Sequence, residues 1–263
     1  MIEPPVKKFV SLDGGTVLGT GIPKVCVPVI GRNAPLFLKN LEAACSAEPD
    51  LIELRIDTLS CQMSDAALLS VLQQAVPTAR LICPVILTDR STRDGGDGAP
   101  DRYTALLSHI LTAGLPVDLL DIEISSGKNN FTSLQNMAAG RHIPVIASWH
   151  DFNTTPSASD IGNIFDLMQT WHADIGKIAV MPQHTDDVDR LTAAAAEADK
   201  RLSIPIIAIS MGALGTRTRL ECEQFGSCMT FASALDASAP GQVGIADVKA
   251  ALSRHHVTLK QKG

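Results

Sequence analysis

The chain has 263 residues, 45% of them hydrophobic, and a formal net charge of -6 at pH 7. This length fits one α/β barrel or two small domains, and the acidic balance argues against a broad nucleic-acid-binding face. Apolar runs are too short to cross a bilayer and the six cysteines form no Cys-x-x-Cys pair, so we expect a cytoplasmic protein with reduced thiols and no metal site.

Short apolar segments alternate with amphipathic segments from about residue 24 onward. In chain order, the expected strands span residues 24–30, 51–56, 80–87, 118–124, 143–149, 175–181, 204–210 and 228–233. The expected helices span residues 34–46, 64–75, 101–113, 129–139, 158–172, 185–200, 217–225 and 245–254. The strands are short and rich in β-branched residues, as strands buried on both faces should be. These eight units predict a (β/α)₈ TIM barrel, with residues 1–263 as a single domain.

The first 23 residues contain no strand–helix unit. The segments FVSL and GTVLGTG predict a short β-hairpin that covers the N-terminal mouth of the barrel. A doubly wound open sheet is the rival architecture. It usually has a Gly-rich phosphate loop after its first strand, where this chain has GRNAPLF instead, so the barrel is favoured.

Polar residues interrupt the expected strands near the ends where a barrel carries its active site. Lys177 lies within the apolar segment IGKIAVM. A buried ammonium group is costly unless it is paired or neutral, and a neutral lysine amine is a nucleophile toward ketones. The alternative is a lysine that reaches solvent or pairs with a carboxylate. His150, which follows the fifth strand, could act as a general base, although a lone histidine is more often structural.

Charged pairs occupy two other strands. Glu53 and Arg55 share one face of the second strand because side chains alternate, which indicates either a buried ion pair or a substrate clamp. Asp121 and Glu123 repeat this spacing on the fourth strand. There we favour a structural role as counter-charges of Lys177.

Two arginines and one late segment indicate an anionic ligand. Arg90 ends the third strand, while Arg219 and the segment ASAPGQ (237–242) add a guanidinium, a hydroxyl and an amide. Together they suit a small hydroxylated carboxylate. From spacing alone, Arg219 fits a solvated helix residue equally well.

Several segments agree in order and spacing with one enzyme family: LIELRID (51–57), SWHDFNTTP (148–156), DIGKIAVMP (174–182), RLECEQFGS (219–227) and ASAPGQ (237–242). From about residue 7 to 254 the chain resembles the type I 3-dehydroquinate dehydratases. The resemblance implies a (β/α)₈ barrel, commonly a homodimer, that needs no metal or organic cofactor. It implies the dehydration of 3-dehydroquinate to 3-dehydroshikimate through a lysine Schiff base, in the shikimate or quinate pathway.

The resemblance also implies roles for single residues. Lys177 falls on the family's Schiff-base lysine, His150 falls on its proton-transfer histidine, and Arg219 becomes the partner of the substrate carboxylate. The other substrate-binding positions implied are Glu53, Arg55, Arg90, Met211, Phe231, Ser238 and Gln242. Asp94, a third catalytic candidate, stands where the family typically has a glutamate. Because it is one methylene shorter, we expect it to reach His150 through a water or a loop shift. Pro28 replaces a residue that is usually serine.

Two other functions stay open. A Schiff-base aldolase would share Lys177, but the joint presence of SWHDF and ASAPGQ argues against it. A non-catalytic barrel that binds a quinate-like ligand is the second alternative. The retention of both Lys177 and His150 argues against it, because a binding module needs neither.

Overall fold

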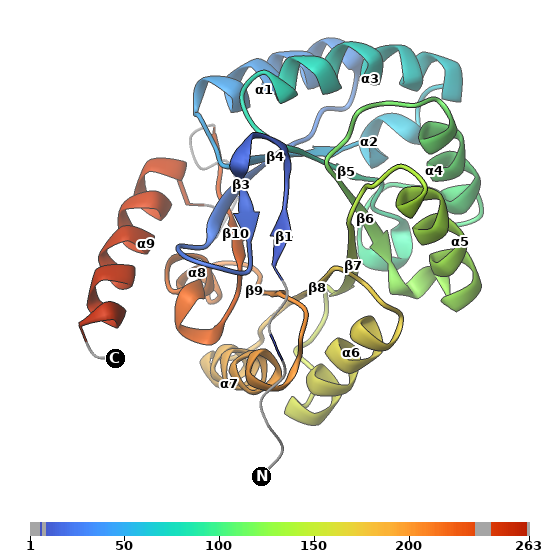
Figure 1. The fold of residues 1–263 in the computed structure, drawn as a ribbon. Coiled ribbons are helices and arrows are strands. Elements are labelled where there is room, and N and C mark those ends of the chain that lie inside the picture. Colours follow the sequence, from blue (N-terminus) through green and yellow to red (C-terminus); the bar gives the residue numbers. More distant parts are fainter. Residues whose placement is uncertain (1–5, 7–8, 235–242, 262–263) are drawn as a thin grey trace.

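The computed structural model describes residues 6, 9–234 and 243–261. Within these residues, eight parallel strands form one sheet in the order β10-β3-β4-β5-β6-β7-β8-β9. They are β3 (Lys24–Val29), β4 (Leu51–Arg55), β5 (Val85–Thr88), β6 (Leu119–Glu123), β7 (Val145–Asp151), β8 (Ile175–Val180), β9 (Ile206–Ser210) and β10 (Met229–Phe231). An isolated parallel bridge between Ile206 and Ser227 brings β9 beside the start of β10. The predicted (β/α)₈ barrel is therefore confirmed (Figure 1).

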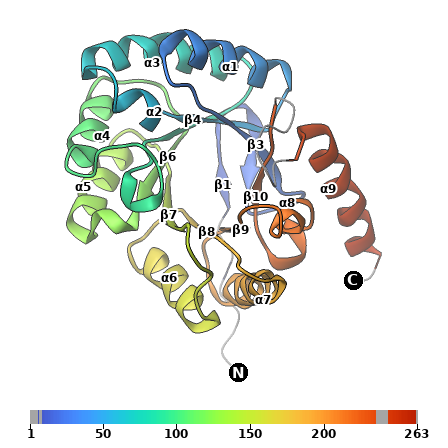
Figure 2. The same ribbon diagram turned by 180° about the vertical axis from the view of Figure 1, so that it is seen from behind.

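Helices cover the outside of the barrel, as the two opposite views show (Figures 1 and 2). They are α1 (Ala34–Ser46), α2 (Asp57–Ser60), α3 (Asp65–Arg80), α4 (Tyr103–Thr112), α5 (Lys128–Ala139), α6 (Ala158–Thr170), α7 (Thr185–Arg201), α8 (Thr216–Leu220) and α9 (Ile245–Lys260). Short 3-10 turns follow some strands and helices: η2 (Thr92–Asp94), η3 (Ile124–Ser126) and η4 (Cys222–Phe225). Across the described ranges, no helix combines the length and apolarity that a membrane span requires.

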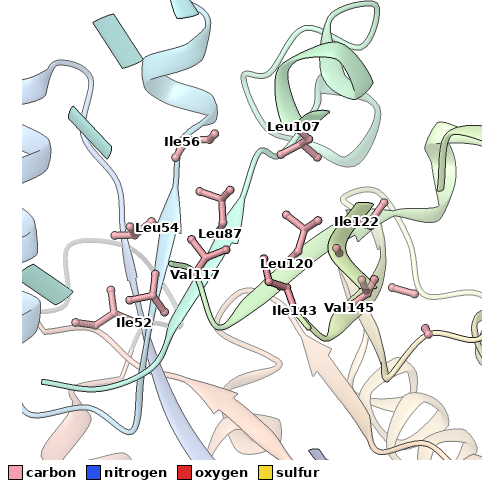
Figure 3. Close-up of a cluster of buried hydrophobic side chains, with 14 of the residues drawn as sticks. Ile52, Leu54, Ile56, Leu87, Leu107, Val117, Leu120, Ile122, Ile143 and Val145 are labelled. Carbon is pink, nitrogen blue, oxygen red and sulfur yellow. The ribbon is translucent and has the colours of Figure 1, made fainter. Parts of the chain in front are cut away.

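The largest apolar cluster lies between the strands and the helices. Figure 3 shows outward-facing side chains such as Ile52 and Leu54 of β4 and Leu120 of β6, all of them buried. Burying one such side chain contributes about 1.5–3 kcal/mol. These outward positions leave the alternate, inward positions of the same strands free to carry polar groups.

A second apolar cluster fills the N-terminal part of the barrel. Inward-facing residues such as Leu51 and Ile175 pack there against Val10, Leu12 and Leu18. The last three belong to or flank an antiparallel hairpin of β1 (Val10–Ser11) and β2 (Val17–Leu18). The predicted hairpin is confirmed, and its apolar side chains close this end of the barrel.

The expected third strand was wrong at its start. The segment predicted as strand from residue 80 is the end of α3 and a turn, and the strand begins only at Val85. Leu81 and Ile82 are 85% and 48% exposed, so the apolar run does not mark a buried strand here. Helix α3 continues through Pro77, which lies on the exposed side of the helix.

Candidate active site

A cavity of about 460 Å³ opens at the C-terminal ends of the barrel strands. It is lined by most of the residues that the sequence indicated: Glu53, Arg55, Arg90, His150, Lys177, Met211, Arg219 and Phe231. Pro28 also lines it, so a ring stands where a hydroxyl was expected from the family pattern. Ser238 and Gln242 lie outside the described residues.

Lys177 lies in a layer of side chains from every second strand. Its Nζ is 3.3 Å from Glu53 Oε1 on β4 and 3.2 Å from Asp121 Oδ2 on β6. The Phe231 ring of β10 has its centroid 4.6 Å from Nζ. In a barrel, alternate strands supply one layer, which explains how residues far apart in sequence meet.

Burial excludes one interpretation of Lys177, and its pairing with carboxylates agrees with another. The residue is only 4% exposed, so the interpretation that its amine reaches solvent is wrong. Asp121 is one of its counter-charges, as expected. Glu123 is not, because its carboxylate accepts bonds from Arg90 and Ser91 instead.

Arg90 is a buried cation at the cavity wall. It donates to Glu123 Oε1 at 3.2 Å and to Ser148 Oγ at 2.8 Å, and pairs with Asp121 Oδ1 at 2.8 Å. Burial alone would lower the pKa of Arg90, but Asp121 and Glu123 raise it above its ordinary value. Burial likewise acts to raise the pKa of Asp121, yet Arg90 and Lys177 outweigh it and the pKa falls. Arg90 and Asp121 thus form a fixed ion pair behind Lys177.

Asp94 touches His150 directly. Its Oδ2 lies 3.1 Å from the His150 backbone nitrogen and 3.2 Å from Nδ1. Of the two routes expected for the shorter carboxylate, a water or a loop shift, the water is not needed, because the turn that carries Asp94 comes close to β7. Gly95 and Gly96 permit this approach: a Cβ on Gly96 would lie 2.1 Å from the Arg90 carbonyl oxygen.

The protonation states of His150 and Asp94 at neutral pH suit proton transfer. Burial lowers the pKa of His150 well below its usual value, and Arg90 and Lys177 act in the same direction. Burial, with Glu123 as the next cause, raises the pKa of Asp94 to about 6. At neutral pH the imidazole is therefore uncharged and Asp94 is ionised. Since Asp94 accepts a bond at Nδ1, the proton of the neutral ring belongs there, and Nε2 keeps a lone pair for use as a base.

Glu53 and Arg55 do not form the ion pair that was one of the two interpretations. Arg55 makes a two-bond contact with Asp57, with Nε to Oδ1 at 2.8 Å and a terminal nitrogen to Oδ2 at 2.9 Å. Glu53 accepts from the Thr88 hydroxyl at 2.9 Å and pairs with Lys177. Both side chains remain at the cavity wall, which agrees with the substrate-clamp interpretation.

Arg219 brings a positive charge without a carboxylate partner among the described residues. One terminal nitrogen donates weakly to the Phe231 carbonyl at 3.4 Å, and Nε is buried with no partner in the same part of the chain. Burial lowers the pKa of Arg219 from its ordinary value. A buried guanidinium at a cavity wall, with an N–H donor that lacks an acceptor among the described residues, is suited to bind an anion.

Sequence reasoning missed several residues of this site. Phe152 and Asn40 line the cavity, and Asp57 orients Arg55. The signal for two of them was present, because Asp57 and Phe152 each come two residues after a residue already singled out. Asn40 lies on α1, and no strand pattern pointed to it. Among the described residues, no group of three or more His, Cys, Asp or Glu is arranged to hold a metal ion.

Comparisons with known proteins show the family of the chain. The model of the family described as Type I 3-dehydroquinase matches residues 25–258. The 3-dehydroquinate dehydratase of Aromatoleum aromaticum is 37% identical, over 96% of this chain and 98% of that protein. The crystal structure of the type I 3-dehydroquinate dehydratase from Clostridium difficile with covalent modified comenic acid gives a TM-score of 0.90 at 36% identity, over 96% of this chain and all of that one. The chain belongs to the type I 3-dehydroquinase family.

Proposed function

We propose that the chain is a 3-dehydroquinate dehydratase, a hydro-lyase that forms 3-dehydroshikimate and water through an imine on Lys177. The observation that carries the proposal is the buried Lys177 amine at a cavity wall shared with His150 and Arg219. Membership of the family supports the substrate. The carboxylate of 3-dehydroquinate is the anion that Arg219 would bind.

The first half of the reaction forms the imine. Lys177 passes a proton to the Glu53 carboxylate, whose Oε1 lies 3.3 Å from Nζ, and its nitrogen lone pair then attacks the C3 ketone. The hydroxyl of the resulting carbinolamine leaves as water with the proton that Glu53 returns, which gives a protonated imine, an electron sink. Glu53 and Asp121 lie within hydrogen-bond distance of Nζ and stabilise the positive charge of this imine.

The second half of the reaction moves one proton. His150 removes the C2 proton, and the electrons of that bond flow into the imine to give an enamine. The enamine then expels the C1 hydroxyl, which leaves as water with the proton that His150 returns. Asp94 holds the imidazole and stabilises its charged form. Hydrolysis of the product imine consumes one water and frees Lys177, so one water is lost overall.

Borohydride trapping tests the imine. Substrate plus reductant should add a stable mass to the peptide that contains Lys177, and not to the peptide with the exposed Lys200 of α7. In the same preparation, the ultraviolet absorbance of the conjugated enone product should rise without reductant. Turnover with an unmodified Lys177 would refute the imine, and a trapped imine without enone formation would refute the dehydratase.

The proposal includes two further points. We propose that the enzyme acts in the cytoplasm as a homodimer of single-domain chains. The six cysteines are all free thiols, as in a reducing compartment. The homodimer is supported only by the family resemblance. Light scattering that gives the mass of one chain would contradict it.

Ser238 and Gln242 complete the proposal as substrate-binding residues. They lie outside the described residues, so the support comes from the match of ASAPGQ to the family pattern.

A further inference from the structure

Glu123 is a completely buried carboxylate that does not line the cavity. It ends β6 and accepts three hydrogen bonds from Arg90 and Ser91, in the loop after β5. Arg90 donates to its Oε1 at 3.2 Å, the Ser91 backbone N–H donates to Oε1 at 2.7 Å, and the Ser91 hydroxyl donates to Oε2 at 2.6 Å. The Glu123 backbone N–H donates to the Tyr103 hydroxyl at 2.9 Å, which ties this strand end to α4.

Ser91 is the anchor of the turn that carries Asp94. The Ser91 carbonyl accepts from the Asp94 backbone N–H at 3.1 Å and from the Gly96 N–H at 2.9 Å. The Ser91 hydroxyl also accepts from the Arg93 N–H at 3.2 Å. A continuous chain of contacts thus runs from Glu123 through Ser91 to Asp94 and His150.

We propose that Glu123 is a positioning residue, which from behind the cavity wall fixes Ser91 and Arg90 and so holds Asp94 against His150. The inference rests on the proposed function for the role of Asp94 and His150, and on geometry alone for the contacts. Glu123 has no access to the substrate, so any effect on the reaction passes through these neighbours.

Glu123 acts on Asp94 through its negative charge as well as through its hydrogen bonds. After burial, Glu123 is the largest cause that raises the pKa of Asp94 to about 6. The other groups that act on Asp94 or touch it come from four neighbouring elements: Arg90 after β5, Asp121 on β6, Ser125 on η3 and His150 on β7. Arg90 and Ser125 lower the pKa and Asp121 raises it. Removing only the Glu123 charge therefore lowers the pKa of Asp94.

Glu123→Gln separates charge from shape, because the amide keeps an oxygen that can accept from Arg90 and Ser91. Asp118→Asn is a matched control. Asp118 directly precedes the opposite end of the same strand, is also buried, and accepts from the Val85 N–H at 2.8 Å and from Arg80. Each variant exchanges one buried carboxylate for an amide, but only one of them is next to Asp94.

The readout is the titration of the Asp94 carboxyl carbon in protein labelled with ¹³C-aspartate, with the signal identified by its absence in Asp94→Asn. We expect a midpoint near pH 6 in the parent and in Asp118→Asn, and a clearly lower midpoint in Glu123→Gln. An unchanged midpoint in Glu123→Gln would overturn the proposal. Since this titration needs no turnover, it stands apart from the test of the dehydratase itself.

Glu123→Ala tests whether the hydrogen bonds to Glu123 hold Asp94 in place. It leaves the Ser91 N–H, the Ser91 hydroxyl and Arg90 without their acceptor, so Asp94 shifts from His150. We expect kcat to fall on the order of 100-fold, the loss that a misplacement of about 1 Å produces. Glu123→Gln should lose much less. Equal kcat values for Glu123→Ala and the parent would also overturn the proposal.

Discussion

One oxygen of Asp94 serves two atoms of His150, lying 3.1 Å from its backbone nitrogen and 3.2 Å from Nδ1. The backbone contact locates the end of β7, and the ring contact selects the tautomer with a proton on Nδ1. A carboxylate one methylene shorter than the family's usual glutamate therefore performs both tasks, because the turn itself approaches the histidine.

The acid side of the pH profile should report Asp94. Burial raises its pKa to about 6, so as pH falls through 6 the carboxylate becomes protonated and stops stabilising a charged His150. We expect kcat to decline below about pH 6 and to be flat just above it. In Asp94→Asn this decline should vanish, with a kcat lower by on the order of 100-fold at neutral pH. The enone absorbance measured from pH 4.5 to 8 checks both, and a variant that kept the parent's profile would contradict the assignment.

Arg219 should govern substrate binding. Hydrogen bonds to charged groups contribute about 1.5–3 kcal/mol, so Arg219→Gln should raise KM by roughly 10- to 100-fold. Arg217→Gln is the matched control, because Arg217 lies two residues away on α8, is exposed and pairs with Asp189. Steady-state kinetics should show no KM change for this control. Similar KM values for the two variants would argue that Arg219 does not meet the substrate carboxylate.

Much of the fold was predictable from the sequence because strands buried on both faces have a distinctive composition. The limits were local. The expected helix stopped at residue 75 and the expected strand began at residue 80, yet α3 continues to Arg80 and β5 begins only at Val85. Strand β7 also runs beyond residue 149 to Asp151, because β8 pairs with it that far, with His150 opposite Ala179. The second error comes from tertiary pairing, which overrides local preference.

The site was predictable in its members but less so in its pairings. Lys177 stood out because a charge within an apolar strand needs a partner. Which carboxylate pairs with Lys177 depends on barrel register. Strands β4 and β6 place Glu53 and Asp121 in the same layer as Lys177. Glu123 lies two residues further along β6, outside this layer. The direct contact of Asp94 with His150 depends on the backbone path of the turn that carries Asp94. No residue pattern in the sequence predicts that path.

Asp89 should make the protein less stable as pH rises. It is 1% exposed, and burial raises its pKa to about 6, although the Ser60 hydroxyl donates to Oδ1 at 2.9 Å. Because the folded state holds this proton more tightly than the unfolded state, the contribution is fully present below pH 4 and lost as pH rises to about 6.

The contribution of Asp89 from pH 4.5 to 7.5 is a loss of about 2 kcal/mol in the free energy of unfolding, and Asp89→Asn should remove that contribution from the pH dependence of the parent. Urea unfolding of parent and variant at the two pH values measures it. Parallel pH dependence in both proteins would show that Asp89 does not take up a proton on folding.

Gly95 should be required for activity because two constraints meet there. Its φ is +76°, and a Cβ would lie 2.2 Å from Cε2 of Phe152 at the cavity edge. Gly114 is a matched control: its φ is +80°, but a Cβ there meets no described atom within 4 Å. Alanine at either position costs about 1–2 kcal/mol for the left-handed backbone.

Only Gly95→Ala should also displace Asp94, because the clash pushes the turn away from His150. We expect kcat to fall at least about 10-fold for Gly95→Ala and to stay at the parent's value for Gly114→Ala, while both variants lose thermal stability. Adding Phe152→Ala to Gly95→Ala removes the clash and should recover part of the lost kcat. If the two glycine variants had the same kcat, the close packing of this turn against Phe152 would not be what holds Asp94 on His150.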